Sequence, residues 1–237
     1  MPDFSNKNIL IIGASSGIGA QLSELLIEAG AQVYTASRTE PKRIGAKHLR
    51  LDITNIQGGE LDELPDELHG LVYCPGSITL KPFNRLSEED FYKDFEINAL
   101  GAAKVIQANL KGLKKAKGAS IVLFSTVASQ VGMSFHASIA MAKGALEGLA
   151  KSLAAELASN NIRVNTIAPS LTDTPLADKL LATDDKREAS AKRHPLGRVG
   201  TPQDMASLAQ FLLSDDASWI TGQSIGVDGG LAGTRAL

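Results

Sequence analysis

The sequence of 237 residues has little cysteine, and Cys74 is its single residue of that type. One thiol excludes an internal disulfide and is compatible with a reducing compartment, so we expect a cytoplasmic protein. No apolar run approaches the roughly 20 residues that span a bilayer. Residues 1–7 are too short and too polar for a signal peptide. These absences predict a chain without membrane association.

An excess of positive charge is also missing. The chain has 24 Lys and Arg residues against 26 Asp and Glu, which gives a formal net charge of −2. Without a basic block, the sequence predicts no nucleic-acid partner, and we expect no metal site. Repeats, low-complexity tracts and linker-like segments are absent as well. We therefore expect one domain over residues 1–237.

The chain does contain short apolar runs that alternate with longer segments of helical pattern. Residues 121–124 (IVLF) are typical of a strand buried on both faces of a sheet. The alternation predicts the α/β class, with a parallel sheet and helices on both faces. The seven expected strands are residues 8–13, 32–37, 48–53, 70–74, 120–125, 162–167 and 224–228.

Residues 170–200 are the least strand-like part of the chain. They mix charges with Leu176, Leu180 and Leu181 at helical spacing. Two interpretations fit this pattern: a lid over a ligand cleft, or a helical excursion on the surface.

Glycine marks the most informative segment, residues 8–20 (NILIIGASSGIGA). An apolar run ends at Gly13, Gly17 and Gly19 follow, and a helical pattern begins. This order of strand, glycine turn and helix suits a dinucleotide, because free N–H groups and the positive end of the helix dipole face the phosphates. An ordinary glycine-rich turn between a strand and a helix is the alternative.

Ligands of open α/β sheets bind at the carboxyl ends of the strands. In this chain those ends are rich in small polar residues, which is typical of a dinucleotide cleft. The expected rim consists of residues 13–19, 37–38, 52–53, 74–76, 125–126 and 169–174.

Taken together, these motifs resemble the classical short-chain dehydrogenase/reductase family over essentially the whole chain. The resemblance rests on residues 13–19 as the cofactor loop, Asp52 after the third strand, and residues 97–101, 163–169, 220–223 and 227–230. It implies a doubly wound Rossmann-type sheet of about seven strands, an NAD(P) cofactor, a small-molecule carbonyl/alcohol substrate similar to that of 3-oxoacyl-carrier-protein reductases, and a homotetramer.

Charge at the end of the second strand favours NADP(H) over NAD(H). An acidic residue is usual there in relatives that prefer NAD, whereas this chain has Ser37 and then Arg38, with Lys42 and Arg43 nearby. A guanidinium pairs well with a 2′-phosphate. The resemblance and this charge predict the following cofactor-binding residues: Gly13, Ser15, Ser16, Gly17, Ile18, Gly19, Ser37, Arg38, Asp52, Ile53, Cys74, Pro75, Gly76, Asn98, Lys143, Pro169, Ser170, Thr172 and Thr174.

The catalytic residues of the family are an Asn, a Ser and a Tyr-x-x-x-Lys pair. Asn98 and Lys143 match, and Thr126 keeps a hydroxyl at the Ser position, thirteen residues before the Tyr position. The Tyr position itself is Ile139, which has no proton to give. A positioned general acid contributes roughly 10²–10⁴ in rate, so this departure bears directly on function.

Tyrosine is scarce, and none of Tyr34, Tyr73 and Tyr92 lies near position 139 in sequence. His136 is the speculative substitute acid, because it would share a face with Ile139 if the helix already included it. We expect Tyr73 and Cys74 to serve packing, and Trp219 to pack near the last strand. The sequence offers no second acid–base pair.

Three functions remain open at this point. The first is an NADP(H)-dependent oxidoreductase with an unconventional acid. The second is a weakly active or inactive cofactor-binding protein, a sensor or the silent subunit of a mixed tetramer. The third is lyase or isomerase chemistry on the same scaffold, since fold does not fix function.

Overall fold

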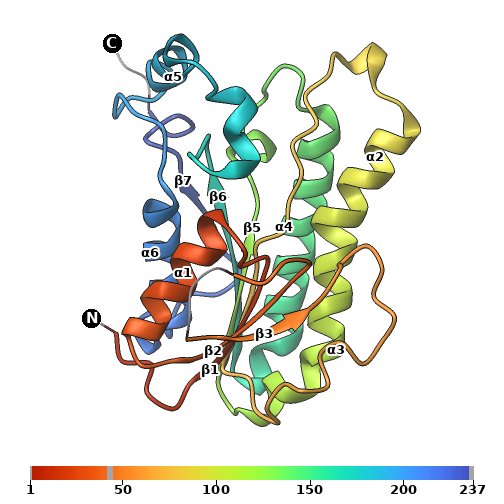
Figure 1. Ribbon diagram of the computed structural model, residues 1–237, viewed down its shortest axis with the longest axis vertical. Coiled ribbons are helices and arrows are strands. Elements are labelled where there is room, and N and C mark those ends of the chain that lie inside the picture. Colours follow the sequence, from red (N-terminus) through yellow and green to blue (C-terminus); the bar gives the residue numbers. More distant parts are fainter. Residues whose placement is uncertain (1, 42–44, 235–237) are drawn as a thin grey trace.

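The computed structural model describes residues 2–41 and 45–234. Seven parallel strands form one sheet in the order β3-β2-β1-β4-β5-β6-β7, and helices cover both faces (Figure 1). The predicted doubly wound α/β fold is thus confirmed. The strands are β1 (Asn8–Ile12), β2 (Gln32–Ser37), β3 (Lys47–Arg50), β4 (Gly70–Tyr73), β5 (Ala119–Phe124), β6 (Ile162–Pro169) and β7 (Ser224–Val227).

Strand β3 is shorter than the sequence predicts and ends before Asp52. The Asp52 carboxylate accepts hydrogen bonds from the backbone N–H and the hydroxyl of Thr54 at 3.0 and 2.8 Å. An Asp that bonds to the backbone two residues onward forms a turn, which competes with continued strand pairing. Asp52 and Ile53 therefore lie on a loop at the carboxyl edge of the sheet.

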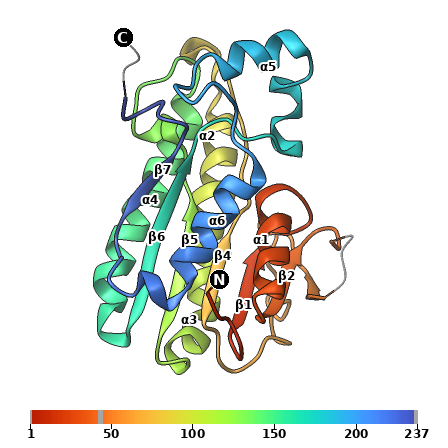
Figure 2. The same ribbon diagram turned by 90° about the vertical axis from the view of Figure 1, so that its left-hand side faces the viewer.

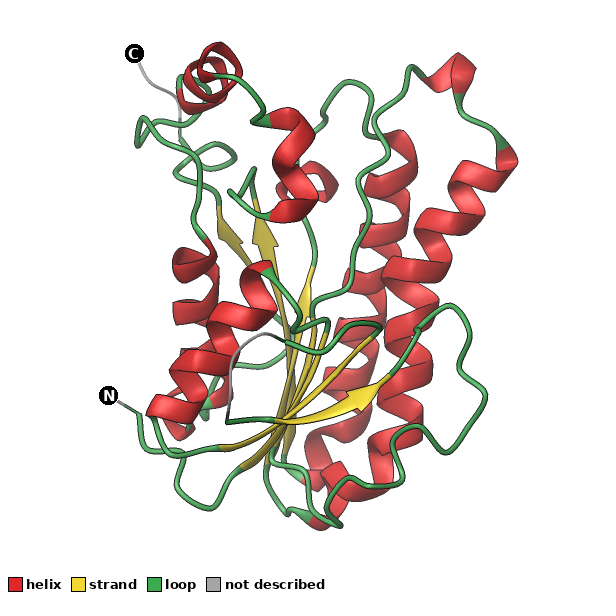
Figure 3. Ribbon diagram, in the orientation of Figure 1, coloured by secondary structure: helices red, strands yellow, loops and turns green. Residues whose placement is uncertain are grey.

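Six α-helices and several short helical turns connect the strands in the described part of the chain (Figure 3). The helices are α1 (Gly17–Glu28), α2 (Glu88–Phe95), α3 (Gly101–Lys115), α4 (Ala137–Leu157), α5 (Asp184–Ala191) and α6 (Pro202–Leu213). A π-helical turn, Glu96–Leu100, joins α2 to α3. The 3₁₀ turns are Phe83–Arg85, Val127–Ser129, Ala158–Asn160, Pro175–Leu180 and Asp215–Ala217.

The two faces of the sheet are buried by different helices because successive strand residues point to opposite sides. Ile9 and Ile11 of β1 pack in the apolar cluster that includes residues of α1 and α6. Leu10 and Ile12 pack in the cluster with residues of α3 and α4. Figure 2 shows the same arrangement from the side. Because the sheet is buried on both faces, the sequences of its strands are nearly continuous apolar runs.

Local signals in the sequence place several helix ends. Ser87 and Thr201 each form a capping box, with Asp90 and Asp204 as the carboxylates, so α2 and α6 begin directly after these two residues. Asn161 adopts the left-handed conformation (φ 57°) after the turn that ends α4. Such a residue stops a helix and turns the chain into the next strand, here β6.

The strand order reverses at β1, which pairs with β2 on one side and β4 on the other. Connections leave the sheet in opposite directions at such a point, and a crevice opens at the carboxyl ends. Residues 175–191, in the helical turn Pro175–Leu180 and α5, lie beyond this end of the sheet (Figure 1).

Candidate functional site

The glycine loop has the geometry that a bound pyrophosphate requires. Gly13 (φ +82°) and Gly17 (φ +59°) adopt a backbone conformation that side chains disfavour. A Cβ on Gly19 would lie 2.5 Å from the carbonyl oxygen of Gly13, so α1 packs tightly on the turn. Ser16 caps α1 without a side-chain hydrogen bond. The first N–H groups of α1 therefore point outward without a capping side chain, as an anion site needs.

A cleft of about 220 Å³, the cofactor cleft, lies beside this loop between β1, β2 and β4. Ser37 donates its hydroxyl to the carbonyl of Thr39 at 2.7 Å. Arg38, the next residue, is exposed and is the cation among the described residues that line the cleft. Lys42 and Arg43, the other expected cations, lie outside the described residues. The predicted cofactor residues that line it are Gly13, Ser15, Ser37, Arg38, Asp52, Ile53, Pro75 and Gly76.

Asp52 stays anionic at the mouth of the cofactor cleft. Its hydrogen bonds from the backbone and side chain of Thr54 lower the pKa of the carboxyl, and the charge of Arg38 adds to the effect. The arrangement gives this end of the cleft one fixed acceptor and one exposed cation.

A second hollow of about 300 Å³, the catalytic cavity, meets the cofactor cleft at Gly76, which lines both. Its wall is mostly apolar, with a few hydroxyl, ammonium and imidazole groups. The predicted site residues in its lining are Ile18, Cys74, Gly76, Thr126, His136, Ile139, Lys143, Pro169, Ser170, Thr172 and Thr174. The structure therefore brings most of the catalytic and cofactor predictions together in two connected hollows, whereas Ser16, Gly17, Gly19 and Asn98 line neither.

Lys143 projects from α4 into the catalytic cavity and is buried (6% exposed). Its Nζ donates to the carbonyl of Phe124, at the end of β5, at 2.6 Å. Burial lowers the pKa of the ammonium to about 8, while nearby Cys74 and Asp94 oppose that shift. Lys143 is thus held at a fixed point with two further N–H donors available to a ligand.

Asn98 lies beneath Gly76 on the π-helical turn between α2 and α3. Its Nδ2 donates to Ser77 Oγ at 2.8 Å and to the carbonyl of Asp94 at 2.7 Å. Its Oδ1 is buried and has no hydrogen-bond partner. A Cβ on Gly76 would lie 3.4 Å from Asn98 Oδ1 and 3.7 Å from Lys143 Nζ. A free acceptor and a free donor therefore face the same small space.

This pair of groups fits a ribose, whose hydroxyl groups both donate and accept hydrogen bonds. A buried acceptor without a partner is costly unless a ligand or water satisfies it. Together with the open N-terminus of α1 and the cation at Arg38, the residues present fit a nicotinamide dinucleotide.

Asp94 holds together the segments that surround Asn98. The carboxylate is buried and accepts hydrogen bonds from Ser77 at 2.5 Å, Thr79 at 2.9 Å and Ser138 at 2.7 Å. Ser138 immediately precedes Ile139, so this network ties the start of α4 to the turn that carries Asn98. The role of Asp94 was not foreseen, because a single acidic residue at a helical position usually marks a solvated face.

Ile139 lies in the lining of the catalytic cavity and is buried (5% exposed). Thr126, in the same lining, caps the turn Val127–Ser129 by accepting the N–H of Ala128 at 3.3 Å. Its hydroxyl proton remains available to a ligand. The cavity therefore has a hydroxyl at the Ser position and a hydrocarbon at the Tyr position.

His136 occupies the N-cap position of α4, one residue before the helix begins, and its side chain makes no capping hydrogen bond. The sequence argument required His136 to lie inside the helix to share a face with Ile139, so that requirement is not met. It still lines the cavity, with Nδ1 bonded to the carbonyl of Ser134 at 2.7 Å.

Tyr73 is buried in the apolar core and donates to the carbonyl of Ile97 at 2.6 Å, and burial raises its pKa. Burial also raises the pKa of the Cys74 thiol to about 12. Tyr73 and Cys74 thus serve packing, as expected.

The segment of residues 170–200 covers one side of the cavity. Leu176 and Leu180 are in the lining, and Leu181 is buried. The same segment holds His194, which no sequence pattern indicated. Its Nε2 lies 2.8 Å from Ser170 Oγ, and both residues line the cavity. Trp219, in the loop before β7, is 98% exposed, so the described residues of this chain do not cover it and its packing near the last strand stays a prediction.

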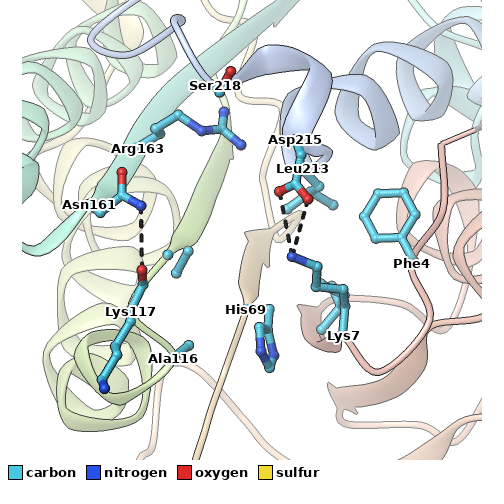
Figure 4. Close-up of a pocket in the computed structure, with 13 residues that line it drawn as sticks. Phe4, Lys7, His69, Ala116, Lys117, Asn161, Arg163, Leu213, Asp215 and Ser218 are labelled. Atoms are coloured by element: carbon cyan, nitrogen blue, oxygen red, sulfur yellow. Dashed lines mark hydrogen bonds and ion pairs between the residues drawn. The ribbon is translucent and has the colours of Figure 1, made fainter.

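The opposite end of the sheet has a polar cleft of about 330 Å³ (Figure 4). Two of its cations are already engaged. Lys7 pairs with Asp215 at 3.4 Å, and Arg163 donates to the carbonyls of Leu212 and Ser214, at the end of α6, at 2.7 and 3.0 Å. Cations that bind the last carbonyls of a helix stabilise its C-terminus. We assign this cleft a structural role.

None of the described helices combines the length and the apolar character that a bilayer crossing requires. Within residues 2–41 and 45–234, no three His, Cys, Asp or Glu side chains gather as a metal ion would need.

Known proteins resemble this chain over nearly its whole length. A family model described as enoyl-(acyl carrier protein) reductase matches residues 13–232. The 3-oxoacyl-acyl-carrier-protein reductase FabG of Vibrio cholerae serotype O1 is 33% identical, over 97% of this chain and 98% of its own length.

Solved structures agree with this result. A short-chain type dehydrogenase/reductase from Mycobacterium ulcerans superimposes with a TM-score of 0.90 at 30% identity, covering 99% of this chain and 92% of that one. The aldohexose dehydrogenase of Thermoplasma acidophilum gives 0.90 at 27% identity, covering 98% and 96%. Family model, relatives, fold and site agree, and the chain belongs to the short-chain dehydrogenase/reductase family of oxidoreductases, whose members take a nicotinamide cofactor.

Proposed function

We propose that this protein is an NADP(H)-dependent oxidoreductase that interconverts a carbonyl and an alcohol on a small molecule. The observation that carries the proposal is the meeting of the two hollows at Gly76, above Asn98 and Lys143. A dinucleotide along the cofactor cleft places its nicotinamide end in the catalytic cavity. The reduced nicotinamide supplies the hydride when it is bound.

Three residues have distinct roles in this proposal. Lys143, whose Nζ is anchored on the carbonyl of Phe124, binds the ribose hydroxyls. Asn98 offers its free Oδ1 to a ribose hydroxyl or to a water beside Lys143. Thr126 donates its hydroxyl to the substrate oxygen and holds the carbonyl in place for hydride transfer.

The preference for NADP(H) rests on Arg38. This exposed guanidinium lines the cofactor cleft next to the end of β2, and the lining has no acidic residue on β2. A bidentate contact with a 2′-phosphate is strong for Arg, whereas an acidic residue there would repel the phosphate.

The apolar wall of the catalytic cavity supports a substrate with a hydrocarbon portion. One of the relatives is named for reduction of a 3-oxoacyl group on a carrier protein, and we propose a substrate of that carbonyl type. The apolar side chains in the lining include Ile78, Leu80, Met133, Leu171, Leu176, Leu180 and Leu231.

Ile139 favours one alternative function, a cofactor-binding protein with little or no turnover. The buried isoleucine removes the acid at that position, while Asn98, Lys143 and the glycine loop are kept. Such a protein would sense the cofactor or act as the silent subunit of a mixed tetramer.

We also propose that residues 1–237 form one domain that assembles as a homotetramer in the cytoplasm. The bare indole of Trp219, 98% exposed, supports a contact with another copy, and the single thiol supports a reducing compartment. Light scattering tests the assembly: a mass of four chains agrees with the proposal, and a monomer contradicts it.

The decisive experiment is a fluorescence titration with NADPH and with NADH, followed by a panel of ketones and 3-oxoacyl thioesters on the same sample. Tight NADPH binding with oxidation supports the oxidoreductase. Tight binding without turnover favours the cofactor-binding alternative. Failure to bind either cofactor contradicts both functions.

A further inference from the structure

Ser170 and His194 form a hydroxyl–imidazole pair that the family resemblance does not assign. We propose that this pair supplies the proton that Ile139 does not, with Ser170 as the residue that touches the substrate oxygen and His194 as the group behind it. The proposal rests on the proposed oxidoreductase function and adds the missing acid–base group to the same cavity.

The hydrogen bonds of the pair fix its chemistry. His194 Nδ1 lies 2.8 Å from the carbonyl of Ser190, and a carbonyl oxygen only accepts, so Nδ1 carries a hydrogen. Nε2 then faces Ser170 Oγ at 2.8 Å and accepts its proton when the imidazole is neutral. The imidazole is 4% exposed and cannot reorient without losing both bonds. This is the arrangement of a base held in one tautomer by a third group.

Position in the fold places Ser170 in the wall of the catalytic cavity. It follows Pro169, the last residue of β6, and its backbone N–H bonds to the carbonyl of Val227 in β7 at 3.3 Å. The carboxyl ends of β5 and β6, at Phe124 and Pro169, lie in the wall of the catalytic cavity. Ser170, Thr126 and Ile139 lie in the same wall. A hydroxyl fixed at this wall and backed by an imidazole is the proton source that the hydrocarbon of Ile139 lacks.

The pair also connects two hollows. Ser170 and His194 line a second space of about 140 Å³ on their other side, together with Asp204, Asp228 and the exposed Arg198. A buried imidazole that donates a proton must regain it after each turnover. This second hollow, with charged as well as apolar side chains in its lining, gives His194 that route without opening the apolar catalytic cavity to water.

Each proton is accounted for in one reduction of the carbonyl. As the carbonyl carbon gains the hydride and the substrate oxygen gains the electron pair of the π bond, the Ser170 O–H bond breaks and a new O–H bond forms on that oxygen. Ser170 Oγ takes the Nε2 proton of a protonated His194, which leaves a neutral imidazole with its hydrogen on Nδ1. The carbonyl is reduced and the cofactor is oxidised. Alcohol oxidation reverses each transfer, with neutral His194 as the base.

Three variants test the pair by steady-state kinetics. We expect Ser170→Ala and His194→Gln each to lower kcat about 10²-fold, the lower range for a general acid. We expect their double variant to lose no more than either alone, because the residues act in series. NADPH affinity, measured by fluorescence without turnover, should change less than about threefold. His48→Gln is the matched control, because His48 Nδ1 also bonds a hydroxyl, that of Thr35 at 3.1 Å, but outside the cavity.

Replacing Ile139 by tyrosine separates proton donation from structure. In the Ile139→Tyr background a second donor is present, so Ser170→Ala should cost less than about threefold there. An equal loss of kcat in both backgrounds would overturn the proposal. So would a Ser170→Ala variant with the kcat of the wild type. A loss of kcat in His136→Ala that His194→Gln does not show would overturn it as well. If the wild type binds NADPH but reduces no ketone, the oxidoreductase function fails and the role of the pair fails with it.

Nitrogen NMR of the imidazole gives a readout without substrate or turnover. The geometry predicts that neutral His194 carries its hydrogen on Nδ1 and that Ser170→Ala shifts the Nε2 resonance. The opposite tautomer would contradict the arrangement on which the proposal stands.

Discussion

Gly19 lies so close to Gly13 that a Cβ on Gly19 would sit 2.5 Å from the Gly13 carbonyl oxygen. This contact sets how α1 leaves the turn after β1, and it therefore aims the open N–H groups of α1 at the cofactor cleft.

The first prediction concerns this contact. Gly19→Ala should lower the free energy of unfolding by about 1–3 kcal/mol, the usual cost of overpacking, and should weaken NADPH binding because α1 must move away from the turn. Urea denaturation and a fluorescence titration measure the two effects. Gly132→Ala is the control, since no heavy atom lies within 4 Å of a Cβ there. Equal stability and affinity in the two variants would show that the contact does not position α1.

The second prediction concerns cofactor choice. Arg38→Ala should weaken NADPH binding roughly 10–100-fold, the equivalent of a charge-assisted hydrogen bond of about 1.5–3 kcal/mol, and should leave NADH binding nearly unchanged. Separate titrations with the two cofactors measure the ratio. Arg85→Ala, an exposed arginine outside the lining of both hollows, is the matched control. An equal loss for both cofactors would contradict a contact with the 2′-phosphate.

The third prediction concerns Ile139. Ile139→Tyr places a phenol one helical turn before Lys143, on the same side of α4, and should raise kcat by about 10² or more over the wild type. Steady-state oxidation of NADPH with a reactive ketone is the measurement. A kcat no higher than that of the wild type would contradict this prediction: either the wall of the cavity does not admit a working tyrosine, or the Ser170–His194 pair already supplies the proton.

The fourth prediction concerns pH and Lys143. Its pKa is about 8 in the folded protein, against the usual 10.5. The unfolded chain therefore binds more protons between these values, and the lysine makes the folded state more stable as pH rises through that window. The free energy of unfolding of the wild type minus that of Lys143→Met should rise by about 3 kcal/mol in total from pH 7 to pH 10.5.

Urea denaturation of both proteins without cofactor measures this difference. Burial raises the pKa of Cys74 and so gives the opposite slope at higher pH, but Cys74 is present in both proteins and its contribution cancels to first order. A difference that stays flat with pH would mean that Lys143 keeps its ordinary pKa in the fold.

Most of the fold followed from local signals. Seven apolar runs became the seven strands, and the capping residues Ser87 and Thr201 placed two helix starts. The third strand was predicted too long. Thr54 donates two hydrogen bonds to the Asp52 carboxylate and so forms a turn, which the pattern of apolar residues does not reveal. Trp219 was expected to pack near the last strand, but the described residues of one chain leave it 98% exposed. Such packing needs a second copy, which residue spacing does not place.

Sequence alone determined the class of fold, the glycine loop and the absence of a tyrosine in front of Lys143, because each depends on residue identity at short spacing. Only the tertiary structure decided which side chains share the cavity. Ser170 and His194 are 24 positions apart and meet at 2.8 Å, and Asp94 gathers hydroxyls from Ser77, Thr79 and Ser138. Such contacts are set by the way β6, the segment of residues 170–200 and α4 pack against one another, and no spacing along the chain encodes them.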